Sequence, residues 1–191
     1  RGCGGRLVCS GFARLAPGYW GWQSGLDFET RLTAKPNAAE QLRRELDKPG
    51  YRVSPIALGV NTDAYQPVEK HREITRDVLK VLVEYRHPVS IITKGALILR
   101  DLDLLSELAH QGLCSVRVSL TTLDNTLKRQ MEPRTAAPAT RLKAIRAPAA
   151  ACVPTGIIPG PVLPFLNQHA IEHHRGVRGK AGAQRATRDT R

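Results

Sequence analysis

Five residues whose side chains could bind an anionic ligand lie at the ends of apolar segments of this chain, or directly after them. They are Asn61, Thr62, Asp63, Lys94 and Ser119. A lysine pairs with a carboxylate or phosphate, Asp63 could bind ribose hydroxyls or an amine, and the hydroxyl and amide groups complete the hydrogen bonding. The set therefore indicates a site for an anionic, hydroxyl-rich small molecule.

Further polar residues lie near this set in the sequence and could join the same site. They are Thr93, Thr121, Thr122, Glu132, Arg134 and Arg141. An alternative role is helix capping, because Thr93, Thr122 and Asp124 each stand where a following helix needs an N-cap. Three consecutive segments that end in polar residues favour a ligand site over capping alone.

The apolar segments alternate with helical patterns, which predicts an α/β fold with a parallel sheet. We expect strands near residues 56–60, 89–92, 115–118 and 153–158, and helices near 37–47, 72–86, 97–111, 126–131 and 138–146. The carboxyl ends of parallel strands meet at one edge of a sheet, so the polar residues should lie close together there. No GxGxxG, P-loop or nucleophile-elbow pattern is present, so Rossmann, ATPase and hydrolase functions have no support.

The chain has 191 residues and a net charge of +12, from 29 Lys and Arg against 17 Asp and Glu. Such a balance favours polyanions such as DNA, although residues 175–191 alone hold six basic residues against Asp189. The sequence has no run of about 20 apolar residues that could span a membrane. It has four scattered cysteines, no apolar leader and no initial Met, so we expect a cytoplasmic protein and a fragment or processed end.

Several stretches closely resemble a bacterial radical SAM family, the DNA-repair-photolyase-like proteins, which are distant relatives of spore photoproduct lyase. The stretches are GLDFETR (25–31), AKPN (34–37), ALGVNTD (57–63), YQP (65–67), ITK (92–94), SLTTLD (119–124) and EPR (132–134). The resemblance covers about residues 25–167, is nearly free of gaps and is specific.

The resemblance implies a partial parallel (β/α) barrel of the radical SAM type, here incomplete at the C-terminal end. It implies a 4Fe-4S cluster whose open iron is chelated by S-adenosylmethionine (SAM). It also implies an electron donor such as flavodoxin or ferredoxin, and radical chemistry of the lyase type on nucleic acid. The loop Asn61, Thr62 and Asp63 would face SAM, Lys94 would pair with its carboxylate and Ser119 would bind nearby. By the same resemblance, Arg134 would lie at this rim.

The cluster loop departs from the family pattern C-x3-C-x2-C. The flanks Arg-Gly-Cys and Phe-Ala-Arg match at residues 1–3 and 12–14, but the interval between them is one residue too long. Cys3 and Cys9 remain as metal ligands in a C-x5-C spacing, and two thiolates do not rebuild the three-thiolate site. We therefore expect the chain as written to be impaired as an enzyme. If a translation error caused the defect, an intact C-x3-C-x2-C motif should appear in a neighbouring reading frame.

We expect three regions: an N-terminal loop region with a degenerate cluster motif (1–36), a partial barrel core (37–167) and a basic, aberrant tail (168–191). Pro148 is expected to interrupt the helix in which it lies. Two alternatives to the radical SAM hypothesis stay open. One is a non-catalytic, basic, nucleic-acid-binding remnant, and the other is an iron-free α/β enzyme of small molecules.

Overall fold

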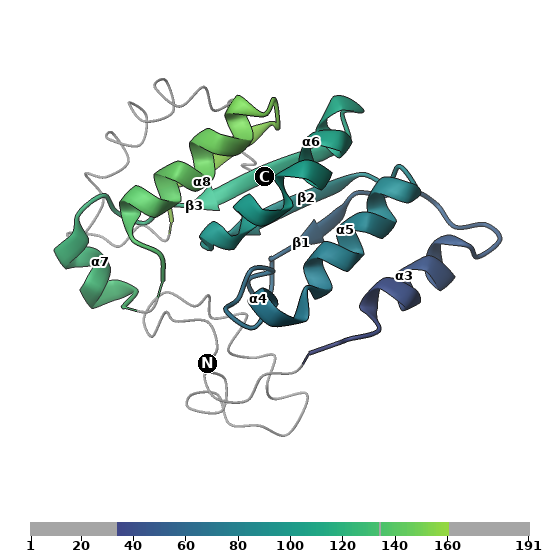
Figure 1. The fold of residues 1–191 in the computed structure, drawn as a ribbon, viewed down its shortest axis with the longest axis horizontal. Helices are drawn as coiled ribbons and strands as arrows, with labels where there is room; N and C mark the ends of the chain where they lie inside the picture. Colours follow the sequence, from purple (N-terminus) through teal and green to yellow (C-terminus); the bar gives the residue numbers. More distant parts are fainter. Residues whose placement is uncertain (1–33, 134, 161–191) are drawn as a thin grey trace, which may run out of the picture.

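The computed structural model describes residues 34–133 and 135–160 (Figure 1). Five residues of the predicted site lie in this part: Asn61, Thr62, Asp63, Lys94 and Ser119. The predicted metal ligands Cys3 and Cys9, and the predicted cofactor-binding residue Arg134, lie outside the described residues. The predicted regions 1–36 and 168–191 also lie almost wholly outside it, so the three-region division stays a prediction.

Four parallel strands form the sheet, and their order in space equals their order in sequence. They are β1 (Ile56–Leu58), β2 (Val89–Thr93), β3 (Cys114–Ser119) and β4 (Thr155–Ile158). The register pairs Leu58 with Ile91 and Ser119 with Ile158 near the carboxyl ends. All four predicted strands are confirmed, and the α/β class with a parallel sheet is confirmed with them.

Helices connect each strand to the next, as expected for βαβ units. The connecting helices are α4 (Glu69–Arg72), α5 (Ile74–Glu84), the 3-10 helix η2 (Ala96–Asp101), α6 (Leu102–His110), α7 (Asn125–Met131) and α8 (Pro138–Ala150), whereas α3 (Ala38–Leu46) precedes β1. In Figure 1, α5, α6 and α8 lie across the strands, while α3 lies outside α5, with which it is in contact.

The core lies between the strands and the helices α5, α6 and α8. Residues of β2 alternate between buried and half-buried, so that Val89, Ile91 and Thr93 point into this layer. Val89 and Ile91 pack there with Leu79, Leu82, Leu105, Leu108, Val116, Val118, Ala144, Ile145 and Ile157. Within the described residues, the helices therefore cover one face of the sheet, and this packing fixes where each strand ends.

Two predicted helices are divided in the structure. Glu73 adopts a left-handed conformation (φ 51°), which ends α4 before α5 begins. The segment predicted as a helix over 97–111 begins as η2 and continues as α6. Asp124 is the N-cap of α7, because its Oδ1 accepts hydrogen bonds from the backbone N–H groups of Thr126 and Leu127.

The expectation that Pro148 interrupts its helix is wrong. α8 continues to Ala150 with Pro148 buried inside it. Pro148 lies in the last turn, where its missing N–H removes one helical bond, and its carbonyl accepts a bond from the N–H of Val153 at 2.9 Å. The helix therefore keeps its length up to the loop that leads into β4.

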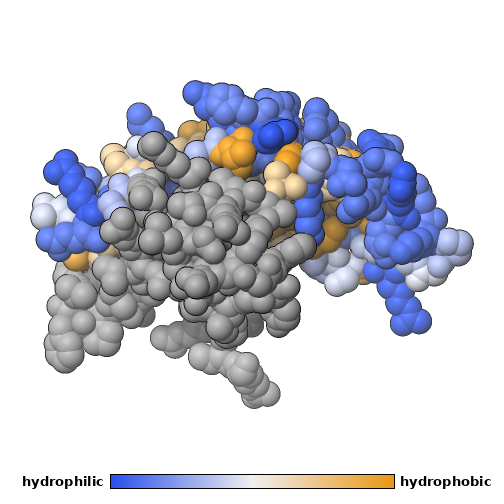
Figure 2. All heavy atoms as spheres, turned by 90° about the horizontal axis from the view of Figure 1, so that it is seen from below, coloured by the Kyte–Doolittle hydropathy of each residue, from blue (hydrophilic) through white to orange (hydrophobic). Residues whose placement is uncertain are grey.

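No helix of the described part is long and apolar enough to cross a membrane. On the side shown in Figure 2, hydrophilic residues dominate the coloured surface, with small hydrophobic spots between them. Among the described residues, Val53 and Val60 are the large apolar side chains that are exposed. The described surface on this side therefore presents no broad apolar patch.

Candidate functional site

The loop after β1 is tied to the end of β2 through Asp63. Its Oδ1 accepts hydrogen bonds from the Thr93 hydroxyl at 2.6 Å and from the backbone N–H of Tyr65 at 2.9 Å. Its Oδ2 accepts one from the backbone N–H of Lys94 at 2.8 Å. Both carboxylate oxygens thus hold protein groups, so the side chain of Asp63 fixes the position of Lys94 at the strand end.

The same two strand ends approach each other at Gly59. This residue has a φ of +84°, and a Cβ atom placed on it would lie 1.9 Å from the carbonyl oxygen of Ile92. Only glycine fits this position, because any side chain meets backbone and the left-handed conformation is costly for other residues. The close approach brings the loop 59–63 against the end of β2.

The other predicted residues of this edge differ in exposure. Asn61 and Thr62 are exposed, whereas Ser119 is buried at the last position of β3. Thr122 accepts a hydrogen bond from the N–H of Asp124 at 3.1 Å, and the Thr121 hydroxyl donates to the carbonyl of Gly160 at 3.3 Å. The two threonines thus shape the turn after β3, and Thr93 likewise accepts from Gly95 N–H in a turn rather than capping a helix.

A buried ion cluster lies beside these strand ends, centred on Glu132. Its side chain is fully buried, and its two oxygens face different cations. Lys94 Nζ lies 2.9 Å from Oε1 in an ion pair, and the Arg141 guanidinium donates to Oε2 at 2.6 Å. The side chains of Lys94 and Arg141 are 19% and 2% exposed, so Lys94 is the member that reaches the surface. We call Lys94, Glu132 and Arg141 the strand-end cluster.

Arg141 anchors this cluster to the backbone. Its Nη1 donates to the carbonyl of Ser119 at 3.0 Å, and its Nε donates to the carbonyl of Ala136 at 3.1 Å. Ser119 ends β3 and Arg141 lies in the first turns of α8. The guanidinium therefore joins the end of a central strand to the helix that covers it, and it holds the Glu132 carboxylate between them.

The electrostatics favour an ionised Glu132. Burial is the largest single influence on its carboxyl group and raises the pKa, but Arg141 and Lys94 together outweigh it and leave the pKa below the ordinary value. The strand-end cluster thus holds two cations against one anion.

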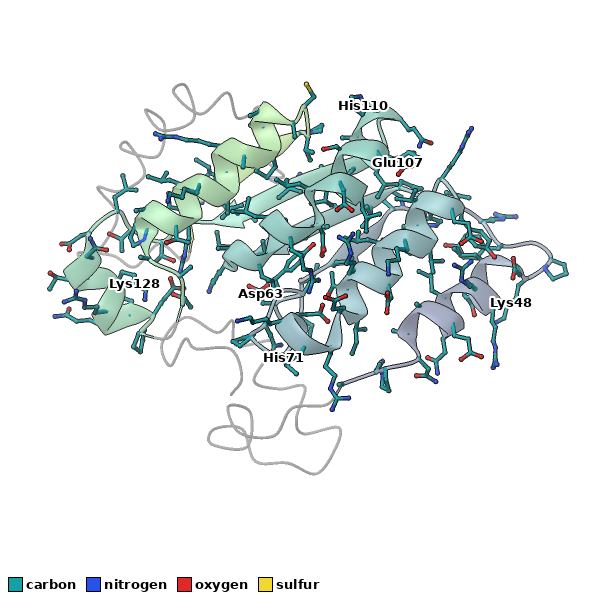
Figure 3. The ribbon with its side chains drawn as sticks, in the orientation of Figure 1. Lys48, Asp63, His71, Glu107, His110 and Lys128 are labelled. Atoms are coloured by element: carbon teal, nitrogen blue, oxygen red, sulfur yellow. The ribbon has the colours of Figure 1, made fainter. Side chains whose placement is uncertain are left out.

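A further cation lies one helical turn away. Lys128 on α7 is buried, and its Nζ donates to the carbonyl of Pro133 at 3.3 Å. Burial and the nearby Arg141 lower its pKa. In Figure 3, Lys128 and Asp63 lie toward the carboxyl ends of the strands. Glu107 and His110, in the C-terminal part of α6, lie toward the other end of the sheet. The carboxyl edge therefore carries surplus positive charge.

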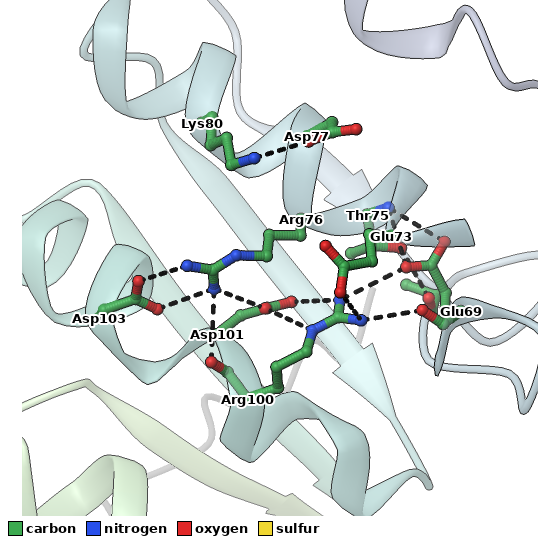
Figure 4. A network of polar contacts seen from close by, with 10 residues as sticks. Glu69, Glu73, Thr75, Arg76, Asp77, Lys80, Arg100, Asp101 and Asp103 are labelled. Atoms are coloured by element: carbon green, nitrogen blue, oxygen red, sulfur yellow. Dashed lines mark hydrogen bonds and ion pairs between the residues drawn. The ribbon is translucent and has the colours of Figure 1, made fainter. Parts of the chain in front are cut away.

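A second ionic cluster lies on the helical side of the molecule, between α4 and α5 on one hand and η2 and α6 on the other (Figure 4). Asp101, fully buried, accepts hydrogen bonds from Arg76 at 2.9 Å and from Arg100 at 2.8 Å. Its further members are Glu69, Glu73 and Asp103. We call it the helix cluster.

The described residues contain no group of three or more His, Cys, Asp or Glu side chains that could hold a metal ion. Cys114 begins β3 and Cys152 precedes β4, so both lie at the amino edge of the sheet. Burial raises the pKa of the Cys114 thiol to about 12, whereas Cys152 is exposed, although its place beside Val153 in the sequence predicts a buried thiol. Within residues 34–133 and 135–160, therefore, no cysteine set fits an iron–sulfur cluster at the strand ends.

Sequence reasoning brought Asp63, Lys94 and Ser119 to one edge, and they do lie there. It placed Glu132 and Arg141 at the same rim but did not predict that they pair with each other and with Lys94. The Glu-Pro-Arg stretch at 132–134 and Arg141, nine positions after Glu132, are the sequence features from which this pairing could have been predicted. The helix cluster was missed, because its members come from four helices with no shared spacing.

Two uncharacterized proteins have sequences similar to that of this chain. The uncharacterized protein Rv2578c of Mycobacterium tuberculosis is 39% identical over 176 residues, which are 92% of this chain and 52% of that protein. The uncharacterized protein MJ0683 of Methanocaldococcus jannaschii is 34% identical over 93 residues, 48% of this chain and 34% of that protein. The chain spans about half the length of the mycobacterial relative, and no family model matches it.

Solved structures of spore photoproduct lyase share the fold. The complex with dinucleoside spore photoproduct matches with a TM-score of 0.55 and 15% identity over 98% of this chain and 61% of that chain. A mutant form matches with a TM-score of 0.55 and 16% identity over 78% of this chain and 43% of that chain. The described residues therefore share the fold of this part of spore photoproduct lyase, which agrees with the expected partial parallel (β/α) barrel.

Proposed function

We propose that the carboxyl edge of this sheet binds S-adenosylmethionine and that the chain is part of a radical SAM protein acting on nucleic acid. The observation that carries the proposal is the surplus of positive charge at the strand ends of a fold shared with spore photoproduct lyase. The substrate class rests on the dinucleoside spore photoproduct bound to that related structure.

The strand-end residues fit the amino-acid end of SAM. Lys94 is partly exposed and pairs with Glu132 through one contact, so its ammonium has donors left for a carboxylate. Asn61 and Thr62 are exposed on the adjoining loop and offer amide and hydroxyl groups to the remainder of the ligand. Asp63 contributes by holding Thr93 and Lys94 in place, since both of its oxygens are used within the protein.

A 4Fe-4S cluster, when present in such a protein, supplies the electron that cleaves SAM to a 5'-deoxyadenosyl radical. The cysteines proposed for it here, Cys3 and Cys9, number two where three are required. We therefore propose that this chain binds SAM without cleaving it. Anaerobic reconstitution with iron and sulfide tests this, and retention of a stoichiometric cluster would contradict it.

Calorimetric titration of the full chain tests the proposed site directly. SAM is compared with 5'-deoxy-5'-methylthioadenosine, which keeps the nucleoside but lacks the sulfonium charge and the whole amino-acid end with its carboxylate. We expect SAM to bind at least about 10-fold more tightly, because one charge-assisted contact to Lys94 contributes about 1.5–3 kcal/mol. Equal Kd values for the two compounds, or no binding of either, would refute the proposed site.

The origin of the cluster defect has its own test. The coding DNA for residues 3–12 is resequenced and translated in all three frames. A neighbouring frame that spells C-x3-C-x2-C before Phe12 would show that the natural protein carries the cluster. Absence of the motif from every frame would mean that the cluster has been lost, and binding alone would remain to be studied.

A non-catalytic role in binding nucleic acid is the second candidate, and the net charge of +12 favours it. Binding of this kind depends steeply on salt, because each neutralised phosphate releases counterions. A steep loss of DNA affinity with salt, together with no measurable SAM binding, would favour this alternative over the radical SAM proposal.

A further inference from the structure

We propose that Glu132 is a positioning residue, which holds the Lys94 ammonium at the end of β2 so that a ligand carboxylate binds it on the exposed side. The inference rests on the proposed SAM site. It adds a residue that cannot itself touch the ligand, because the Glu132 side chain is fully buried. Its effect on binding must therefore act through Lys94.

The two oxygens of Glu132 have separate tasks. Oε2 accepts a hydrogen bond from Arg141. The other donors of Arg141 are engaged by the carbonyl groups of Ser119 and Ala136 and by the hydroxyl of Thr135. Arg141 is thus fixed to β3 and to the turn before α8, and it fixes Glu132 in turn. Oε1 faces Lys94 Nζ at 2.9 Å. A lysine side chain otherwise has four rotatable bonds, so this contact selects one position of its ammonium.

The charges of the cluster leave a place for an anion. One carboxylate lies between two cations, and Lys128 lies one turn away on α7. Buried cations need anionic partners, since removing a charge from water is costly unless it is paired. Lys94 is the cation with exposed surface, so an added carboxylate would approach it from that side. The neighbouring acid Asp63 does not take this role, because its oxygens accept hydrogen bonds from Thr93 and from the backbone N–H of Lys94.

A double-mutant cycle tests the inference by calorimetry on the full chain. The measured quantity is the ratio of the Kd values for 5'-deoxy-5'-methylthioadenosine and SAM. The ratio reports the sulfonium charge and the amino-acid end of SAM together, and Lys94→Met isolates the part that depends on the carboxylate. We expect Lys94→Met to lower this ratio by about 10- to 100-fold and Glu132→Gln to lower it by about 5- to 10-fold. In the Lys94→Met background, Glu132→Gln should leave the ratio unchanged, because Glu132 acts on the ligand only through the ammonium of Lys94.

The matched control is Asp101→Asn. Asp101 is also fully buried and also pairs with two cations, but it belongs to the helix cluster. Its substitution should lower stability and leave the Kd ratio as in the wild type. A role of Glu132 in stability alone predicts the same behaviour for Glu132→Gln, and that result would overturn the inference.

Glu132→Asp keeps the test decisive if Glu132→Gln does not fold. It retains the charge but withdraws it by one methylene group, so the ratio should fall by about 2- to 5-fold. An unchanged ratio in Glu132→Asp, with a lowered ratio in Lys94→Met, would refute the positioning role and leave the SAM site intact. A wild-type protein that does not prefer SAM would instead refute the proposed function itself.

Discussion

The strand-end cluster and the helix cluster are built on the same plan, with a fully buried carboxylate between two cations, but their total charges differ in sign. Around Glu132 the partners are Lys94 and Arg141, and no second acid joins them in the described residues. Around Asp101 the two arginines meet three further acids, Glu69, Glu73 and Asp103. The first cluster has cations to spare, while the second has acids to spare.

The difference indicates what each cluster is for. The helix cluster fastens α4 and α5 to η2 and α6, and its arginines are satisfied by protein groups (Figure 4). The strand-end cluster lies at the carboxyl edge, where a parallel α/β fold binds ligands, and its Lys94 is partly exposed. A surplus of cations at that edge suits an anionic ligand, whereas the helix cluster holds helices together and needs no ligand.

The largest effect should follow from Arg141→Ala. This change leaves the buried Glu132 with Lys94 alone and removes the bond to the Ser119 carbonyl, so we expect a loss of about 3–5 kcal/mol in the free energy of unfolding. Urea denaturation measures it. Arg43→Ala is the control, because Arg43 forms an exposed ion pair with Glu84 and should cost less than about 1 kcal/mol. Equal losses would remove the distinction between the buried cluster and a surface pair.

Asp101→Asn should come next, with a loss of about 2–4 kcal/mol, because it leaves two arginines facing a neutral amide. Urea denaturation again measures the stability, and titration with SAM measures the binding. We expect the stability to fall while the SAM affinity of the folded protein is unchanged. A matching loss of SAM affinity would show that the two clusters are not independent.

Gly59→Ala tests how far the strand-end region depends on close backbone contact. The added Cβ meets the Ile92 carbonyl, so we expect a loss of about 2–3 kcal/mol by thermal or urea unfolding. Gly50→Ala is the matched control, since Gly50 has a similar φ of +83° but no atom within 4 Å of the added Cβ. It should cost only about 1 kcal/mol, the cost of the left-handed conformation. Equal losses of stability in the two variants would mean that the left-handed backbone conformation, and not the contact with Ile92, determines the cost.

The smallest effect concerns pH. The folded-state pKa of Glu132 lies below its ordinary value of 4.5, so ionised Glu132 contributes stability above that pH and loses it as pH falls through the folded pKa. Wild type and Glu132→Gln should therefore differ most near neutral pH and converge in acid below pH 4.5. Urea unfolding across this range measures it, and a difference that is constant with pH would contradict the ionised pair.

Periodicity alone predicted the strands and the edge at which the polar residues meet. Apolar runs that end in polar residues are a local signal, which is why Asp63 and Lys94 could be placed together. The task of Asp63 was not predictable, because its hydrogen bonds run to Thr93 and Lys94, thirty residues away in sequence. The break at Glu73 and the continuation of α8 through Pro148 depend on tertiary packing, which overrides the local preferences of those residues.

The strand order β1-β2-β3-β4 has a consequence for synthesis on the ribosome. Each new strand adds to the edge formed by the preceding one, so no strand has to insert between two that are already paired. Glu132, however, emerges nine residues before Arg141, its main counter-ion. A nascent chain paused between them has a carboxylate that cannot yet be buried at low cost. Closure of the strand-end region therefore waits for α8, and we expect protease resistance of the nascent chain to rise at that length.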